Sequence, residues 1–254
     1  MWDSPRQLNA VALIVAVAAL SVLGWAAGSW AVRQPAFAFQ EVVIRGPLTM
    51  ANPAHLEAVV REELKGTFFT MRLADARAAL ARVPWVRSIA LRRAWPRRLE
   101  VTVSEHEPLA RWNDTALVDV QGDTFAAAYD GDLPQFNGPE GMSRQVAQRF
   151  GEFGDALKPT GLTLGEIRLS ERGGWELKTA GERPLTLELG RVEPMARLER
   201  FVAYYPATVA RLQRAGTRVE QVDLRYRNGF AARVPEFREA AAKKPAADQL
   251  RNKH

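Results

Sequence analysis

Residues 10–32 read AVALIVAVAALSVLGWAAGSWAV, an apolar run without a charged side chain that lies between Arg6 and Arg33. As a helix this run would extend about 35 Å, at 1.5 Å per residue. The hydrocarbon core of a bilayer is about 30 Å thick, so one such helix crosses it. No later stretch of the sequence is comparably long and apolar. We therefore expect a single transmembrane helix at residues 10–32.

A cleaved signal peptide is the alternative interpretation of the same run. Signal peptides have a shorter apolar region of ~7–15 residues, a basic leader and a small-residue cleavage site. Here the run is longer, Asp3 offsets Arg6 in the leader, and no A-x-A pattern closes the run. Tryptophans lie toward both ends of the helix, as interfacial anchors do: Trp2 on one side and Trp25 and Trp30 on the other. These features favour a retained anchor.

The orientation of the anchor follows from the charges at its two ends. Arg6 and the amino group precede the run and Arg33 follows it, so the positive-inside rule gives a small preference for a cytoplasmic N-terminus. We expect residues 1–9 to be a cytoplasmic tail and the large hydrophilic body to lie outside the cytoplasm.

Gly24 and Gly28 form a G-x-x-x-G spacing inside the apolar run. Small residues four apart allow two membrane helices to approach closely. The spacing has two interpretations: chance in an Ala- and Gly-rich helix, which we favour, or a docking face for another membrane helix.

The composition excludes several kinds of site. The chain has 254 residues, no cysteine and a formal net charge of +6. Without cysteine, disulfides and thiolate metal sites are excluded. A basic balance attracts anionic lipid, acidic protein or nucleic acid, and a membrane-tethered body outside the cytoplasm argues against nucleic acid.

Hydrophobic periodicity predicts two α+β domains that meet near residue 110. The first, residues 39–108, has the order strand, helix, helix, strand, strand. Asn52 and Pro53 predict the start of its first helix, as N-cap and first helical residue. The expected elements are a strand at 39–45, helices at 52–65 and 72–82, and strands at 86–93 and 99–104.

The second domain, residues 109–235, has a different order of elements. A hairpin is expected around residues 121–123, and the stretch 130–141 is expected to be a loop because it is rich in Gly, Pro and Asp. Residues 236–254 are mostly Ala, Lys and Arg and show no large apolar pattern, which predicts a disordered tail. The remaining expected elements are helices at 146–157, 194–205 and 208–215 and strands at 164–169, 175–179, 185–189, 219–226 and 230–234.

Sequence motifs for catalysis are missing. The sequence has three histidines and contains no G-x-S-x-G, S-x-x-K or H-E-x-x-H motif and no Gly-rich phosphate loop. His106 lies between Glu105 and Glu107, but one strand would not converge these side chains on a metal. We expect no cofactor, no metal and no small-molecule substrate. A pair of carboxylates that meets only in space remains open, and with it a cell-wall hydrolase.

Arginines cluster within one stretch of the first domain, residues 82–98. A nucleic-acid patch would interleave aromatic residues among them, and Trp85 and Trp95 are present. The simpler interpretation, which we favour, is a solvated hairpin edge whose basic side chains contact anionic lipid. The arginines are Arg82, Arg87, Arg92, Arg93, Arg97 and Arg98.

A strand at residues 222–226, followed by the turn signal Asn228-Gly229, is the most suggestive late feature. A strand at a sheet edge can accept an added strand from a partner, and Arg and Tyr are common interface anchors. From these residues alone, a buried strand with a capped turn is an equally good interpretation.

Several short strings, spaced along nearly the whole folded chain, resemble the FtsQ/DivIB family of bacterial cell-division proteins and the POTRA module that it contains. The strings read VPWV at 83–86, RAWP at 93–96, LEV at 99–101, EPLARWN at 107–113, VD at 118–119 with Gly122 and Phe125, NGPEG at 137–141, LGR at 189–191, RL-x-RFV-xx-YP at 197–206 and VDLRY at 222–226.

The resemblance implies an α+β fold with one transmembrane helix, a POTRA module and a second, mixed β domain with flanking helices. It also implies a non-enzymatic scaffold at the division septum of the inner membrane. In such proteins the last strands of the distal domain bind FtsB, and through it FtsL. The matching positions are Arg225, Tyr226, Asn228 and Gly229, with Arg172 as a looser match to a basic position that meets an acidic partner residue.

The resemblance further implies that the POTRA module contacts other division proteins and that the scaffold helps to control septal peptidoglycan synthesis by FtsW and FtsI. An outer-membrane assembly factor is a further alternative, because POTRA modules also occur there. It would need many amphipathic strands of ~10 residues after the module, and the sequence supplies too few.

Overall fold

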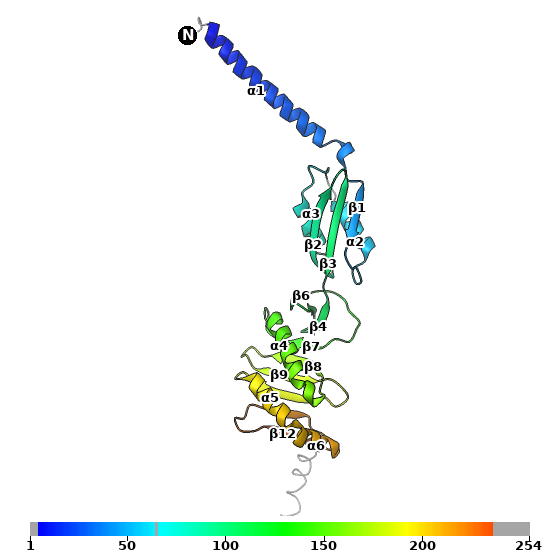
Figure 1. The fold of residues 1–254 in the computed structure, drawn as a ribbon, viewed down its shortest axis with the longest axis vertical. Coiled ribbons are helices and arrows are strands. Elements are labelled where there is room, and N and C mark those ends of the chain that lie inside the picture. The colour runs from blue at the N-terminus through cyan, green and yellow to red at the C-terminus, as the bar shows by residue number, and fades with distance from the viewer. Residues whose placement is uncertain (1–4, 64–65, 236–254) are drawn as a thin grey trace, which may run out of the picture. The chain divides into compact units, whose positions relative to one another are not determined.

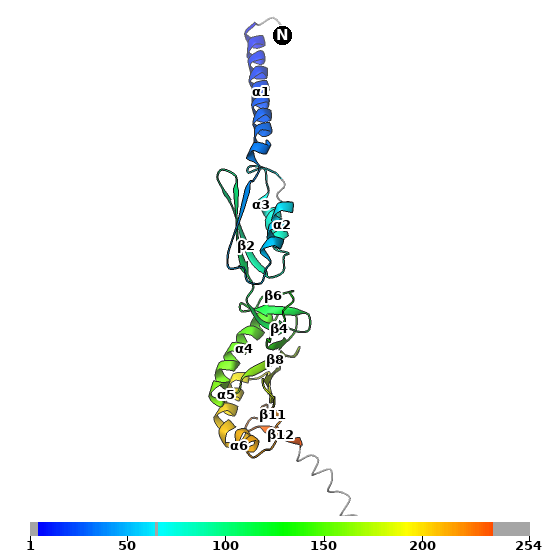
Figure 2. The ribbon, with the colours of Figure 1, turned by 90° about the vertical axis from the view of Figure 1, so that its right-hand side faces the viewer.

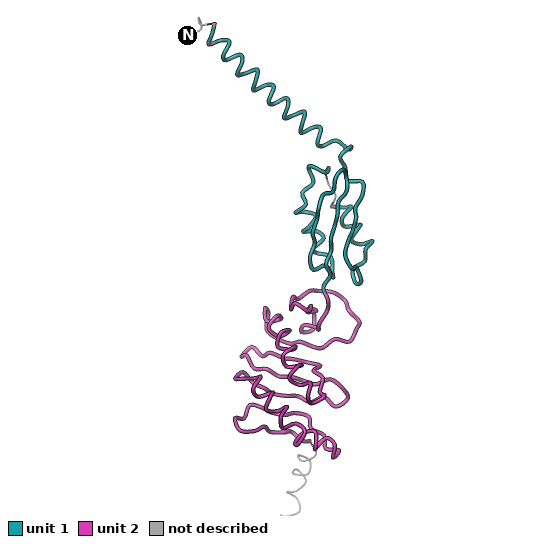
Figure 3. Tube along the Cα trace, in the orientation of Figure 1, with its two compact units in different colours: residues 1–106 teal, residues 107–254 magenta. Residues whose placement is uncertain are grey.

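The computed structural model describes residues 5–63 and 66–235, so the predicted tail at 236–254 and the first residues of the predicted N-terminal tail lie outside the described residues. The chain divides into two compact units, with the boundary between His106 and Glu107 (Figures 1 and 3). Each unit has its own sheet.

A single long helix, α1 (Pro5–Val32), opens the chain. It begins earlier than the apolar run because proline and the polar residues after it suit a first helical turn. Its segment Leu8–Val32 is long and apolar enough to cross a membrane, with a mean hydropathy of 2.4, and none of it is buried in the described protein. Side chains added at Gly24 or Gly28 would meet no other described atom within 4 Å.

The first unit confirms the predicted order β-α-α-β-β. A short 3-10 turn, η1 (Pro35–Phe37), leads into β1 (Glu41–Arg45), and the sheet has the order β1-β3-β2. β1 pairs parallel with β3, and β2 pairs antiparallel with β3. The other elements are α2 (Pro53–Glu63), α3 (Leu73–Leu80), β2 (Val86–Ala94) and β3 (Arg98–Glu105).

Both helices of this unit lie on one face of the sheet (Figure 2). The start of α2 is capped as predicted, because the Ala54 N–H donates to Asn52 Oδ1 at 2.9 Å. Alternate residues of β3 face the helices and are buried, and they meet the apolar faces of α2 and α3 in one core. The most buried members are Leu56, Val60, Ala76, Leu80, Leu99, Val101 and Val103.

The second unit is built on a nine-stranded sheet with the order β12-β11-β10-β9-β8-β7-β4-β5-β6. The strands are β4 (Pro108–Trp112), β5 (Ala116–Asp119), β6 (Thr124–Phe125), β7 (Gln135–Asn137), β8 (Leu164–Leu169), β9 (Trp175–Thr179), β10 (Thr186–Gly190), β11 (Gln221–Asp223) and β12 (Ala231–Arg233).

Two long helices pack on one face of this sheet (Figures 1 and 2). Along the central strands, apolar residues that face these helices alternate with charged residues on the opposite face, so the opposite face is polar. The helices and turns are α4 (Ser143–Leu157), η2 (Lys158–Thr160), α5 (Pro194–Tyr204), η3 (Tyr205–Ala207) and α6 (Val209–Arg214).

The expected loop at 130–141 is wrong in its middle. β7 lies there, parallel to both β4 and β8, and joins the two halves of the sheet. Its central residue, Phe136, is completely buried and packs against Phe150 of α4, with ring centroids 4.8 Å apart. A strand of three residues between Gly and Pro carries almost no local periodicity, so neighbouring strands rather than the segment itself determine it.

Candidate functional site

One edge of the nine-stranded sheet is β12, and of the two interpretations left open for the preceding strand, the structure has the interior strand. β11 pairs parallel with β10 on one side and antiparallel with β12 on the other, so β11 is an interior strand. It also ends at Asp223, three residues before the predicted end at Tyr226. The described sheet has no strand beyond β12, whose three residues are all exposed.

The turn between β11 and β12 carries four of the five predicted partner-binding residues. Arg225, Tyr226 and Asn228 are exposed, and Gly229 is partly exposed. The side chain of Tyr226 is 58% exposed, which is high for a large ring. These residues therefore lie beside the edge strand on a turn, rather than on the edge strand itself.

Arg225 is held by carboxylates of two neighbouring strands. Its Nε and Nη2 donate to Asp223 Oδ1 and Oδ2 at 2.8 and 2.7 Å, and Nη2 also lies 3.0 Å from Glu188 Oε2. The hydrogen bond from the Arg225 side chain lowers the pKa of Asp223, outweighing the effect of partial burial. The guanidinium thus fixes the start of the turn to β10 and β11.

The other end of this turn is held from α5. Arg200 Nη1 donates to the Arg227 carbonyl oxygen at 2.6 Å and lies 3.4 Å from that of Tyr226. Side-chain donors on backbone carbonyls fix the path of a turn that lacks ladder hydrogen bonds. The exposed Tyr226 ring is therefore presented on a backbone that is anchored on both sides.

Arg172 lies in the tight turn between β8 and β9. Ser170 closes this turn by accepting from the Gly173 N–H at its carbonyl oxygen and from the Gly174 N–H at its Oγ, both at 2.9 Å. Arg172 is exposed and has no hydrogen bond or ion pair with the rest of the described chain. Its guanidinium is available to a carboxylate of another molecule.

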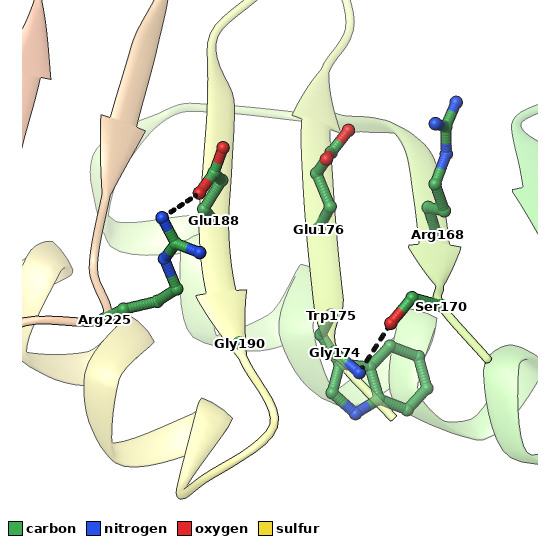
Figure 4. Close-up of a pocket in the computed structure, with 8 residues that line it drawn as sticks. All are labelled: Arg168, Ser170, Gly174, Trp175, Glu176, Glu188, Gly190 and Arg225. Atoms are coloured by element: carbon green, nitrogen blue, oxygen red, sulfur yellow. Dashed lines mark hydrogen bonds and ion pairs between the residues drawn. The ribbon is translucent and has the colours of Figure 1, made fainter. Parts of the chain in front are cut away.

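One shallow cavity of about 270 Å³ brings this turn and Arg225 to the same end of the sheet. Ser170 and Gly174 line one side of it and Arg225 lines the other, with the ends of β9 and β10 between them (Figure 4). Charged side chains, Trp175 and backbone line the cavity, which is open to solvent. This geometry suits a surface contact rather than an enclosed catalytic site.

Sequence reasoning missed the residues that position the turn. Glu188, Gly190 and Arg200 are distant in sequence and belong to other elements. Gly190 has φ +70°, and a Cβ there would lie 3.0 Å from Arg197 Nη1 and 3.1 Å from Arg225 Cγ. The string LGR at 189–191 was the available signal, because a glycine at the end of a strand often marks a close approach.

The other predicted residues are not brought to this site. Gly24 and Gly28 lie on α1, and their role in helix packing stays a prediction. Within residues 5–63 and 66–235, His106 included, the structure has no group of three His, Asp or Glu side chains that could hold a metal ion.

Comparison with known proteins gives consistent matches along the chain. The family description "Cell division protein FtsQ/DivIB, C-terminal" matches residues 110–225, and "POTRA domain, FtsQ-type" matches residues 37–106. The first match ends at Arg225, so the remainder of the turn and β12 lie just beyond it.

The chain is also similar to curated proteins named "Cell division protein FtsQ". It is 39% identical to that of Burkholderia pseudomallei over 245 residues, covering 94% of this chain and 96% of the relative. For Nitrosospira multiformis the identity is 37%, covering 92% and 99%. For Escherichia coli the identity is 31%, covering 90% and 84%.

Proposed function

The chain belongs to the FtsQ/DivIB family of cell-division proteins, and from this premise we propose that it is a non-enzymatic, membrane-anchored scaffold that binds an FtsB/FtsL subcomplex. In this role it links early and late division proteins and helps to control septal peptidoglycan synthesis. The POTRA module and α1 provide contacts to other division proteins. The observation that carries the proposal is the exposed edge strand β12 beside the anchored turn at 225–229.

The edge strand supports binding by strand addition. Among the described strands, β12 pairs with β11 alone, so its other side offers backbone N–H and C=O groups to an extended segment. Main-chain hydrogen bonds supply affinity in this mode, and side chains beside the strand supply selectivity. Tyr226 is the residue best placed to anchor such a segment, because its ring is exposed and its backbone is fixed.

Charge supports an acidic segment as the partner. Arg172 has no partner among the described residues, and Arg227 is exposed in the turn itself. By contrast, the guanidinium of Arg225 is already engaged by Asp223 and Glu188. We therefore assign Arg172 a direct ionic contact and Arg225 mainly the positioning of Tyr226, with Asn228 and Gly229 shaping the turn.

α1 and the family support the proposed location. One apolar helix near the N-terminus fits a single-pass protein of the inner membrane. We propose that the N-terminus is cytoplasmic, that both folded units lie in the periplasm, and that the chain gathers at the division septum.

The test is the substitution Tyr226→Ala, with Tyr204→Ala as its control. Both tyrosines are 58% exposed, but Tyr204 lies at the end of α5 rather than in the turn. Capture of an FtsB segment by the full-length chain in detergent should weaken at least about tenfold for Tyr226→Ala, a loss of about 1.4 kcal/mol. Tyr204→Ala should bind as the unaltered chain does, and circular dichroism should be the same for all three.

Unchanged affinity in Tyr226→Ala would defeat the assignment of this site. The substitution Arg172→Glu adds a test of charge, because reversing it should weaken capture, and a compensating Lys in the acidic segment should restore part of it. If Arg172→Glu leaves capture unaltered, the proposed ionic contact is wrong.

The enzymatic alternative has its own measurement. A cell-wall hydrolase using paired carboxylates would clear peptidoglycan in a zymogram of the full-length chain. Clearing would overturn the scaffold proposal. The outer-membrane assembly alternative has no support from the relatives, whose names all describe cell division.

A further inference from the structure

Five aromatic rings form a continuous cluster at one end of the first unit. Phe37 meets Phe69 with ring centroids 5.3 Å apart, and Phe69 meets Phe68 at the same separation. Phe68 in turn lies 5.8 Å from Trp95 and 5.9 Å from Phe39. The rings come from three separate segments: the entry to β1, the loop between α2 and α3, and the β2–β3 turn. We call them the aromatic cluster.

Backbone hydrogen bonds hold these three segments together. The Phe68 N–H donates to the Phe37 carbonyl oxygen at 2.7 Å, and the Gln40 N–H donates to that of Arg97 at 2.9 Å. The register agrees, since Glu41 at the start of β1 pairs with Arg98 at the start of β3. The cluster is therefore a built feature of the fold rather than a chance meeting of loops.

The cluster is not covered by the rest of the described chain. Trp95 is 70% exposed and Phe69 is 47% exposed, and the other three rings are partly exposed. Contiguous apolar surface of this kind on a folded domain marks a contact with a membrane or another molecule. Aromatic rings in a core would be buried, so packing alone does not account for them.

The position of the cluster along the chain indicates what it contacts, because the cluster lies close to the end of α1. α1 ends at Val32, and Phe37 follows five residues later, which limits its distance from the helix end to about 18 Å. In addition, Thr67 Oγ1, next to Phe68, donates to the Val32 carbonyl oxygen at 2.6 Å. If α1 crosses a bilayer, the cluster must lie close to the surface from which the helix emerges.

We propose that the aromatic cluster enters the lipid interface and seats the first unit on the membrane beside its own anchor. The proposal goes beyond the scaffold function and rests on the membrane anchor assigned above. The occupant is the boundary between headgroups and acyl chains, where Trp gathers on membrane proteins and where Phe and Trp form the buried side of interfacial segments.

The charges beside the cluster are positive, which suits a location next to lipid phosphates. Arg33 follows α1 directly and is exposed, and Arg97 donates to the Ala36 carbonyl oxygen at 3.2 Å. Basic side chains at this depth contact lipid phosphates, and each near the surface strengthens binding to anionic lipid. Glu41, at the start of β1, is paired with Arg98 at 2.8 Å. The rim of the cluster is therefore basic.

The absence of cysteine in the sequence allows a direct measurement of depth. Single cysteines that carry a nitroxide are introduced into the full chain by Phe69→Cys, Met50→Cys and Leu20→Cys. Met50 is the matched control: it is apolar, 43% exposed and at the opposite end of the sheet, where it follows β1. Each chain is reconstituted in vesicles of phosphatidylethanolamine and phosphatidylglycerol, and collisions with oxygen and with a water-soluble nickel chelate are measured.

The expected result is that the label at residue 69 collides more with oxygen and less with the nickel chelate than the label at residue 50. Equal accessibility at residues 69 and 50, with the label at residue 20 in the hydrocarbon, would overturn this proposal and leave the anchor intact. A label at residue 20 that is open to water would overturn the anchor itself. Loss of partner capture on Tyr226→Ala is independent of all three labels.

A second variant separates insertion from a merely local shielding of the label. Trp95→Ser, added to Phe69→Cys, removes an exposed ring that packs on Phe68 and should shift the label at residue 69 toward water. The label at residue 20 should not move. If Trp95→Ser leaves the accessibility at residue 69 unaltered, the ring does not hold the cluster in lipid, and the proposal fails.

Discussion

Glu105, the last residue of β3, accepts four hydrogen bonds from one loop of the first unit. Its Oε2 accepts from the Thr49 N–H, the Thr49 hydroxyl and the Met50 N–H at 2.9, 2.9 and 3.1 Å, and its Oε1 accepts from the Ala51 N–H at 2.8 Å. One carboxylate thus satisfies three backbone donors that no helix or strand engages.

We expect Glu105→Gln to destabilise the first unit by about 1–2 kcal/mol, because the amide offers one acceptor oxygen where the carboxylate offers two. Glu57→Gln is the control, since its pair with Arg61 is exposed and worth at most about 0.5 kcal/mol. Urea unfolding of the full chain in detergent, followed by hydrogen exchange in β1–β3, measures both. Equal effects of the two substitutions would contradict this account.

The same carboxylate predicts a dependence on pH. Burial acts to raise the pKa of Glu105, but the hydrogen bonds from Thr49, Ala51 and Met50 outweigh it, so the pKa lies below its ordinary value of 4.5. The ionised form therefore stabilises the fold. This contribution is complete above pH 4.5 and is lost as the pH falls through the lowered pKa. In Glu105→Gln, the difference in stability from the unaltered chain should shrink as the pH falls below 4.5.

Gly122, in the turn between β5 and β6, is required by a close approach as well as by its backbone angle. It has φ +83°, and a Cβ would lie 2.6 Å from Arg144 Cα on α4. Gly141 has a similar φ of +78° with no described atom within 4 Å of its Cβ position.

We expect Gly141→Ala to cost about 1 kcal/mol from backbone strain alone, and Gly122→Ala to cost about 2–3 kcal/mol because α4 must also move. Thermal unfolding of the second unit measures the difference. Equal losses of stability in the two variants would show that the close approach of residue 122 to α4 leaves room for a methyl group.

At the scale of the element, the sequence predicted correctly those strands whose own residues alternate between apolar and polar. β8 and β9 occupy the predicted residues, because clean alternation and flanking turn signals specify them. β7 could not be predicted, because its partners β4 and β8 determine it. The predicted strand at 219–226 stops at Asp223 for a related reason: the side chain of Asp223 binds Arg225 and turns the chain.

The coupling between α5 and the turn at 225–229 gives a prediction at this scale. Arg200→Ala removes the donor to the Arg227 carbonyl oxygen, so amide exchange in residues 225–230 should become faster and partner capture should weaken by about 1–2 kcal/mol. Arg211→Ala on α6 is the control, because Arg211 is exposed and its side chain has no hydrogen bond within the described residues.

If Arg200→Ala makes amide exchange in the turn faster but leaves partner capture unaltered, the rigidity of the turn does not contribute to binding. Unaltered exchange in Arg200→Ala would instead show that Asp223 and Glu188 hold the turn without help from α5.

At the scale of the whole molecule, each unit has its own hydrophobic core. Leu80 is fully buried between α3 and the first sheet, and Phe153 of α4 packs edge to face on Trp175 of β9, with ring centroids 5.7 Å apart. The core of the second unit draws its buried residues from position 110 onward.

Leu80→Ala and Phe153→Ala should therefore each weaken one unit only, by about 2–5 and 3–5 kcal/mol. Hydrogen exchange of the full chain in detergent should become faster in β1–β3 for Leu80→Ala and in β7–β10 for Phe153→Ala. Faster exchange of both units in either variant would show that they unfold together.

The general architecture was predictable at this scale, and the order of strands in the larger sheet was not. One apolar run predicted the long helix α1, and the family strings predicted the two folded parts. By contrast, β10 and β11 are adjacent in the sheet, but α5 and α6 separate them along the chain. Their parallel pairing is therefore a long-range contact. No periodicity within either strand specifies that pairing. The location of the sheet edge, and so of the candidate site, required the structure.

The shortness of β12 limits how well two copies of the chain can associate through this edge when many copies share one membrane. Two copies that met edge to edge would join two ladders of three residues, Ala231–Arg233, with an arginine on each. Such self-association gains few hydrogen bonds and brings like charges together, as in the short, charged edges that resist aggregation. An acidic foreign strand gains the same ladder with attraction in place of repulsion. We therefore expect the chain not to self-associate through β12 at high surface density, which leaves this edge open to the proposed acidic segment.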